Sequence, residues 1–216
     1  MTAQESVGTE EAEGSPDRLV ALSDGIYAIV MTLLVLDIKV PDGLDSSGFR
    51  HAVAHLWPQL VAYVWSFYIL ATFWRDQRRL FLRVRRVDAL LLRLTLASLG
   101  AVALLPFTTA LLADYRTQSL AVALYAAVIT CIVALHLAIA ATVWRHGHLQ
   151  AVPISDQFGR AVIQDLGATV IVFGLSVPVA FASPLAALCV WLLLIPTKIA
   201  TGRQARSANR RSSPRP

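Results

Sequence analysis

Cysteine, lysine and charge are scarce in this chain of 216 residues, and each shortage narrows the class of protein. The two cysteines, Cys131 and Cys189, lie in apolar segments without disulfide or metal-site spacing, so we expect small buried hydrophobic residues. Only 15% of the residues are charged, 56% are hydrophobic, and the mean hydropathy is +0.59. This composition argues against an ordinary soluble domain and is typical of a membrane protein with several spans.

Several motifs are also missing. No Thr-Val-Gly-Tyr-Gly sequence is present, which is the loop that builds a carbonyl filter for potassium. The histidines are scattered and neither cysteine has a base nearby in the sequence, so we expect no enzyme, no resident metal and no cofactor. No basic region precedes an apolar core near the start, so no secretory signal peptide is expected.

The formal net charge is +5, and nearly all of the positive charge is carried by arginine, because the chain has only two lysines, Lys39 and Lys198. The arginines cluster beside apolar segments, which favours a role in membrane orientation over binding of nucleic acid. The clusters at residues 75–86, at residues 145–160 and in the C-terminal tail are predicted to be cytoplasmic, and this places both termini in the cytoplasm.

Long apolar segments make up most of the chain, and a membrane span needs about 20 such residues. The sequence predicts an all-α polytopic membrane protein with six spans, at about residues 19–38, 57–74, 87–112, 120–144, 161–182 and 185–199. Pro106 is expected to kink or divide the third span. Residues 1–16 are predicted to be a disordered acidic tail and residues 201–216 a disordered basic tail, on either side of one membrane domain at residues 17–200.

The first span contains polar residues near its start, at Ser23, Asp24 and Gly25. A carboxylate at the centre of a span costs about 2.5–3.5 kcal/mol, and Asp24 lies only about 7 Å inside, so its cost should be smaller. Arg93 enters the third span from the same side and is a candidate partner for Asp24. The alternative is that the Arg93 side chain extends to the lipid headgroups.

An aliphatic stripe follows on the same helix. Ile29, Thr32, Leu33 and Leu36 recur at i, i+3, i+4 and i+7, and Asp24 lies on the opposite side. If the stripe lines a pore, Asp24 therefore points into the surrounding helices. Periodicity alone favours contact with lipid or with a neighbouring helix over an ion path.

The motif Arg18-x-x-x-Leu22-Ser23-Asp24-Gly25 resembles the signature of the bacterial potassium channels related to transmembrane protein 175, with Leu22 in place of phenylalanine. The resemblance extends over about residues 17–145, with supporting matches at Phe73-Trp74, Arg79-Leu80-Phe81 and Leu105-Pro106-Phe107. The family often has a His-His pair shortly after the Phe-Trp, where this chain has Gln77 and Arg78.

This resemblance implies a homotetramer in the bacterial plasma membrane, with the first helix lining a central pore. Ile29, Leu33 and Leu36 match the family's constriction, and Thr32 matches its threonine ring. An aliphatic ring cannot coordinate a cation, so the expected result is modest selectivity for K⁺ over Na⁺, because Na⁺ holds its water more tightly.

Two alternatives remain open at this point. Asp37 could raise the local cation concentration at the outer mouth of the pore, or it could pair with Lys39. A secondary transporter of a cation or small solute is the alternative function, although it would be expected to carry acidic residues near the membrane midplane.

Overall fold

The computed structural model describes residues 16–36, 38–40, 43, 45–54 and 56–192. The regular elements in this part of the chain are helical, which confirms the predicted all-α class. They are α2 (Pro16–Leu36), α3 (Ser46–Ala54), α4 (Trp57–Phe81), α5 (Ala89–Ala103), α6 (Leu105–Asp114), α7 (Ser119–Arg145), the short 3₁₀ turn η1 (Gly147–Leu149), α8 (Asp156–Ala182) and α9 (Pro184–Leu192).

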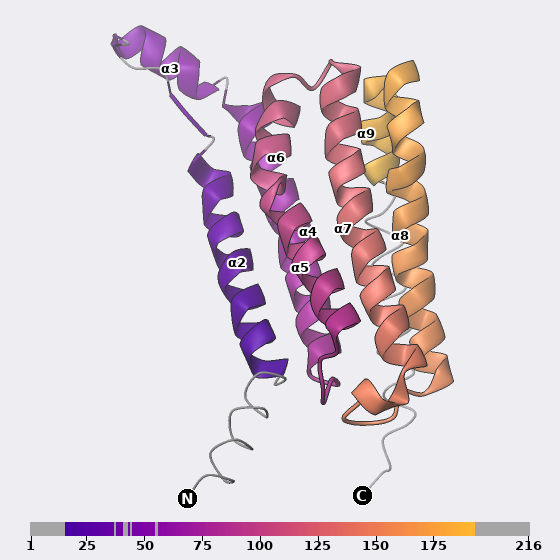
Figure 1. Ribbon diagram of the computed structural model, residues 1–216. Helices are drawn as coiled ribbons and strands as arrows, with labels where there is room; N and C mark the ends of the chain where they lie inside the picture. Colours follow the sequence, from indigo (N-terminus) through magenta and orange to yellow (C-terminus); the bar gives the residue numbers. More distant parts are fainter. Residues whose placement is uncertain (1–15, 37, 41–42, 44, 55, 193–216) are drawn as a thin grey trace, which may run out of the picture.

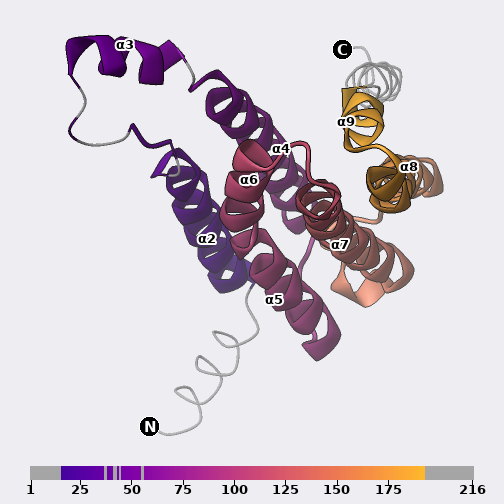
Figure 2. The same cartoon turned by 90° about the horizontal axis from the view of Figure 1, so that it is seen from above.

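Helix α7 lies in the middle of the bundle, between α5 and α6 on one side and α8 and α9 on the other (Figures 1 and 2). Its side chains Val122, Tyr125, Ile129, Ile132 and Val133 are all fully buried and form the centre of the hydrophobic core. Helix α2 packs against α4, α5 and α6 at the opposite edge from α8 and α9. Helix α2 therefore lies at one edge of the bundle and the pair α8–α9 at the other, with the remaining long helices between them.

Four helical stretches in the described part of the chain are long and apolar enough to cross a membrane: α2, α5 with α6, α7 and α8. A fifth is reached if α3 and α4, which meet at an angle of 42°, are counted as one bent span. Of the sixth predicted span, α9 covers the beginning, and residues 193–199 lie outside the described residues.

The third span is divided where the sequence predicted. Helix α5 ends at Ala103 and α6 begins at Leu105, with Pro106 in the first turn of α6. Proline lacks the N–H that a continuous helix would need and its ring clashes with the preceding turn. In α6, the Thr109 hydroxyl donates to the Leu105 carbonyl at 2.8 Å. At the start of α5, Asp88 acts as the cap, because its carboxylate accepts from the Leu91 N–H at 2.7 Å.

Two boundaries differ from the prediction. Helix α4 continues to Phe81, so the part of the basic connector from Arg75 to Arg79 is helical rather than a loop. Arginine is a good helix former, and its long side chain reaches water or headgroups from the last turns of a span. Helix α8 begins at Asp156, five residues before the predicted span, because Ser155 caps it by accepting from the Phe158 N–H.

The segment between the first and second predicted spans contains the short helix α3. Asp45 caps it, because its carboxylate accepts from the Gly48 N–H at 2.8 Å and from the Ser47 hydroxyl at 2.7 Å. The hydrogen bond from Ser47, followed by that from Gly48, holds the pKa of Asp45 below its usual value. Asp45 and the serines beside it are residue types that occur both at helix caps and in loops. The sequence therefore did not distinguish a short capped helix from a loop.

The prediction that both cysteines are buried is wrong. Cys131 on α7 and Cys189 on α9 are exposed on the surface of the single chain. The buried face of α7 is filled by larger neighbours such as Ile129 and Ile132, and a thiol is apolar enough to face a lipid environment without a partner.

Two basic connections meet at one end of the bundle. Val84 in the α4–α5 connection pairs with Gln150 in the α7–α8 connection in an isolated antiparallel bridge. The Arg83 guanidinium also lies 3.8 Å from the centre of the Phe158 ring, so it stacks on the start of α8. Helix α2 begins at the same end (Figure 1). The arginine-rich segments therefore lie together, as the charge pattern requires.

Gly159 on α8 gives a stability test. A Cβ at this position would lie 2.5 Å from the Trp144 ring, so Gly159→Ala is expected to overpack this contact and cost about 1–3 kcal/mol. The change should lower the thermal unfolding midpoint of the protein in detergent.

Gly167→Ala is the matched control, because Gly167 lies on the same helix with open space around its Cβ position. This variant should be neutral or slightly stabilised, since alanine is the better helix former. Equal destabilisation of both variants would contradict the assigned contact.

Candidate functional site

Helix α2 has two contrasting faces. Leu19, Ser23, Tyr27, Val30 and Leu34 are buried against the bundle, at spacings of three or four residues. On the other face, Ile29 is 59% exposed, Leu33 41% and Leu36 63%, and Thr32 is exposed between them. The stripe singled out from the sequence therefore points away from the chain's own bundle.

The hydroxyl of Thr32 is turned back toward its own helix. It donates to the carbonyl of Ile29 at 2.7 Å, one turn earlier. The hydroxyl proton is used within the helix, and the Thr32 oxygen keeps lone pairs that can accept a hydrogen bond or contact a cation.

Asp24 faces α4, as the helix geometry predicted. The indole N–H of Trp74 donates to its Oδ1 at 2.7 Å, and the guanidinium of Arg78 donates to its Oδ2 at 2.6 Å. Trp74 and Arg78 are four residues apart on α4, so both reach the same carboxylate, and the guanidinium also lies 5.7 Å from the Trp74 ring centre. Both carboxylate oxygens are thus held by one neighbouring helix.

The cation that pairs with Asp24 is Arg78 rather than the candidate Arg93, whose side chain is exposed on α5. This position fits the alternative in which Arg93 extends to the headgroups. In the sequence, Arg78 is part of the basic cluster at residues 75–86, with no partner predicted for it in the first span. Its contact depends on α4 continuing as a helix past the apolar segment.

Ser23 begins a second set of buried hydrogen bonds. Its hydroxyl donates to the Leu19 carbonyl at 2.8 Å and accepts from the Gln77 side-chain amide at 3.2 Å. The Gln77 carbonyl oxygen lies 3.2 Å from Nε2 of His136 on α7, and the same nitrogen lies 3.3 Å from the Tyr27 hydroxyl. Two consecutive residues of α4 therefore both contact the motif, Gln77 at Ser23 and Arg78 at Asp24.

Sequence reasoning missed the roles of Tyr27, Trp74, Gln77 and Arg78 in this site. His136 of α7 contacts two neighbouring helices, through Tyr27 of α2 and Gln77 of α4. A usable signal was present, because residues 74, 77 and 78 share one face of a helix at i, i+3 and i+4.

A small hollow lies where this site meets the end of α4. Its polar lining comes from Ser23, Asp24, Gln77 and Arg78, and it has room for about one water molecule. Within the described residues, no group of three or more histidine, cysteine, aspartate or glutamate side chains is placed to hold a metal ion.

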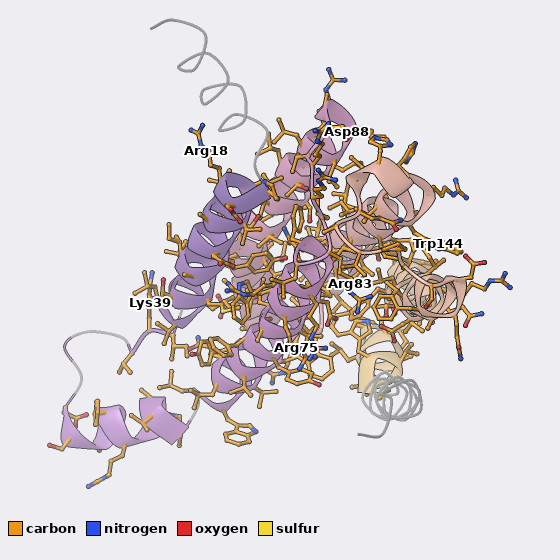
Figure 3. The ribbon with its side chains drawn as sticks, turned by 90° about the horizontal axis from the view of Figure 1, so that it is seen from below. Arg18, Lys39, Arg75, Arg83, Asp88 and Trp144 are labelled. Atoms are coloured by element: carbon orange, nitrogen blue, oxygen red, sulfur yellow. The ribbon has the colours of Figure 1, made fainter. Side chains whose placement is uncertain are left out.

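The remaining predicted residues lie outside this network. Arg18 is exposed and points away from the bundle at the start of α2 (Figure 3). Leu22 is 46% exposed, and Gly25 is exposed with open space around its Cβ position. Asp37 lies outside the described residues.

Taken together, these features define a helical membrane protein whose first span is fixed by polar contacts on one face and open on the other. The family model "Endosomal/lysosomal potassium channel TMEM175" matches residues 18–106, which include the whole of this site except His136. A potassium channel of Streptomyces collinus is 42% identical over 139 residues, which are 61% of this chain and 66% of that protein.

Two further comparisons extend this result. The crystal structure of a lysosomal potassium-selective channel TMEM175 homolog from Chamaesiphon minutus superposes with a TM-score of 0.74 at 26% identity, covering 86% of this chain and 97% of that chain. The human endosomal/lysosomal proton channel TMEM175 is 41% identical over 101 residues, 42% of this chain and 20% of that protein. The chain thus spans less than two thirds of the length of the curated relatives that it matches.

The chain is therefore similar in sequence and in fold to the TMEM175 family, a family of ion channels and not of enzymes.

The Asp24–Arg78 pair can be tested by a double-mutant cycle with Asp24→Asn and Arg78→Gln. The two side chains are 33% and 47% exposed, so we expect a coupling free energy below about 1 kcal/mol. The coupling should fall when ionic strength rises from about 0.1 M to about 1 M, because screening shortens the reach of partly exposed charges. The measurement is unfolding of the four proteins in detergent.

Trp74→Phe supplies the control, because it removes a neutral donor to the same carboxylate. Its effect should change little with salt. A coupling of several kcal/mol that does not change with salt would contradict this expectation, because it would mean that water does not reach the two side chains.

Proposed function

We propose that this chain is one subunit of a potassium-permeable channel in which the first helices of several copies surround the ion path. The observation that carries this proposal is the contrast between the two faces of α2. One face is hydrogen-bonded to α4 through Ser23 and Asp24 and to α7 through Tyr27. The other face leaves four residues exposed: Ile29, Thr32, Leu33 and Leu36. This helix lies within the part of the chain that matches the family model.

Exposure alone does not separate α2 from the other outer helices. Ile171 on α8 is 60% exposed, for example, and contact with lipid accounts for it. Helix α2 differs from α8 because buried hydrogen bonds and an ion pair to neighbouring helices fix its rotation about its own axis. A lipid-facing helix gains little from such fixation, whereas a helix that sets the width of a pore has to be held in one orientation.

The proposed selectivity mechanism is dehydration at an aliphatic constriction. Rings of Ile29, Leu33 and Leu36 offer no oxygen to replace the water around a cation. The free energy that an ion loses on dehydration is therefore not recovered at this position. Na⁺ binds water more tightly than K⁺ and meets the higher barrier, which gives modest selectivity for K⁺. The Thr32 oxygen, which keeps its lone pairs, offers partial compensation next to the ring.

The proposed assembly is a homotetramer in a bacterial plasma membrane, with residues 17–200 forming six spans in each subunit. The shared end of the two basic connections supports a cytoplasmic location for that end and for the N-terminus. With six spans the C-terminus is cytoplasmic too. Asp37 is then at the outer mouth, where a ring of carboxylates would concentrate cations.

The choice of ion rests on the wider of the two similarities. The Streptomyces relative, named a potassium channel, aligns over 61% of this chain, whereas the human relative, named a proton channel, aligns over 42%. We therefore propose K⁺ and other monovalent cations as the permeant ions.

A flux assay in liposomes separates a channel from the alternative function, a secondary transporter. Passive K⁺ flux that follows the imposed voltage supports a channel, and saturable flux coupled to a second solute would support a transporter.

Ile29→Asn tests the constriction. A ring of amides wets the narrow section and offers oxygens to either ion, so the K⁺/Na⁺ permeability ratio should fall toward one while the conductance rises. The measurement is the reversal potential in mixed K⁺ and Na⁺ solutions.

Ile171→Asn is the matched control, with the same substitution at almost the same exposure on α8. It should leave the permeability ratio unchanged. If the two variants behave alike, Ile29 is not part of the constriction.

Leu33→Cys, in a background with Cys131→Ser and Cys189→Ser, tests the assembly. Residues that face a shared axis approach their copies, so oxidation should produce disulfide-linked dimers of subunits. Val64→Cys is the control, because Val64 is 62% exposed on α4 and is not assigned to the axis. Cross-linking at Val64 but not at Leu33 would place a different helix at the centre.

A further inference from the structure

We propose that His136 is a positioning residue for the ion path: through Gln77 and Tyr27 it fixes the rotation of α2, although it lies on α7 and has no place in the pore. Its effect on ions rests on the function proposed above. Its effect on the position of α2 does not, and the two parts are tested separately.

The hydrogen-bond directions follow from the partners. The Ser23 hydroxyl has one proton and donates it to the Leu19 carbonyl, so it can only accept from Gln77. The Gln77 amide nitrogen therefore faces Ser23, and its carbonyl oxygen faces His136. A carbonyl oxygen only accepts, so Nε2 of His136 carries the proton and donates it.

This assignment makes His136 the start of a directed chain that runs from α7 through α4 to α2. The Tyr27 hydroxyl lies 3.3 Å from the same Nε2, so a second residue of α2 meets the same donor. Ser23 and Tyr27 are four residues apart on the buried face of α2, and a rotation of the helix would break both contacts together.

The ring of His136 is itself held in place. It is 6% exposed, and the Phe73 ring of α4 packs against it edge to face, with ring centres 5.5 Å apart. Helix α2 packs mainly on α4, α5 and α6, and His136 gives the central helix α7 a hydrogen-bonding contact with α2. A donor held this firmly defines where Gln77, and through it α2, can sit.

A second buried polar cluster provides the comparison. Ser66 of α4 lies 3.0 Å from the Tyr125 hydroxyl of α7 and 2.9 Å from the Thr109 hydroxyl of α6. This cluster also ties α7 to α4, but it includes no residue of α2. Tyr125→Phe therefore removes a buried interhelical hydrogen bond of the same kind without touching the first helix.

Two substitutions at His136 distinguish the effect of the position of the donor nitrogen from the effect of having any polar side chain there. The amide nitrogen of glutamine is as many bonds from Cβ as histidine Nε2, so His136→Gln can still donate to Gln77. The amide nitrogen of asparagine is one bond shorter and corresponds to Nδ1, so His136→Asn keeps a polar side chain and loses the contact.

The position of α2 can be measured by pulsed electron paramagnetic resonance. One spin label is attached to the native Cys131 of α7 and one to Ala28→Cys on the exposed face of α2, in a Cys189→Ser background. Labelled subunits are diluted with unlabelled ones so that distances within one chain dominate. The permeability ratio is measured on the same His136 and Tyr125 variants.

We expect His136→Asn to shift or broaden the distance distribution and to lose K⁺ preference, while His136→Gln and Tyr125→Phe keep both properties. An unchanged distribution in His136→Asn would overturn the positioning role. A shifted distribution with an unchanged permeability ratio would keep the positioning role and overturn the assignment of α2 to the ion path. If His136→Asn does not fold, Gln77→Met breaks the same chain at its middle and should give the same shift, and the absence of that shift overturns the inference.

Discussion

A polar side chain inside a membrane bundle has to find its partner within the protein, because the hydrocarbon around it offers none. This constraint determines how α2 sits. Ser23 and Asp24 lie one after the other on the helix and take separate partners, Gln77 and Arg78, which are also consecutive on α4. Two adjacent pairs between two helices define both their relative rotation and their relative height, which apolar contacts alone leave adjustable.

The apolar core complements this arrangement. The fully buried residues of α7 give the bundle its rigid centre, and the polar contacts are placed at its boundary with the outer helices. Helix α2 is thereby attached to a rigid body on one side and is free to meet other molecules on the other. In a proposed oligomer, the free faces of several such helices can approach one another without disturbing the bundles that carry them.

The sequence predicted the parts of this structure that depend on one helix at a time. The spans α2 and α7 and the division of the third span at Pro106 follow from local composition and periodicity. The direction of the Ile29 stripe did not, because periodicity alone left contact with lipid and contact with a neighbouring helix open. The partner of Asp24 did not follow, because Arg78 and Arg93 enter from the same side and only the packing decides between them. The cysteines were misjudged for a related reason: a membrane protein has apolar residues on the outside as well as the inside, so an apolar neighbourhood does not imply burial.

The peripheral location of α8 and α9 has a consequence for how such a protein can change. These two helices pack on α7 and on each other, with Arg83 stacked on Phe158 as an additional tie, and they lie across the bundle from α2. Substitutions in α8 and α9 change their contacts with α7 and leave the α2 edge of the bundle unchanged. Such substitutions can therefore be accommodated without altering the contacts that position the first helix.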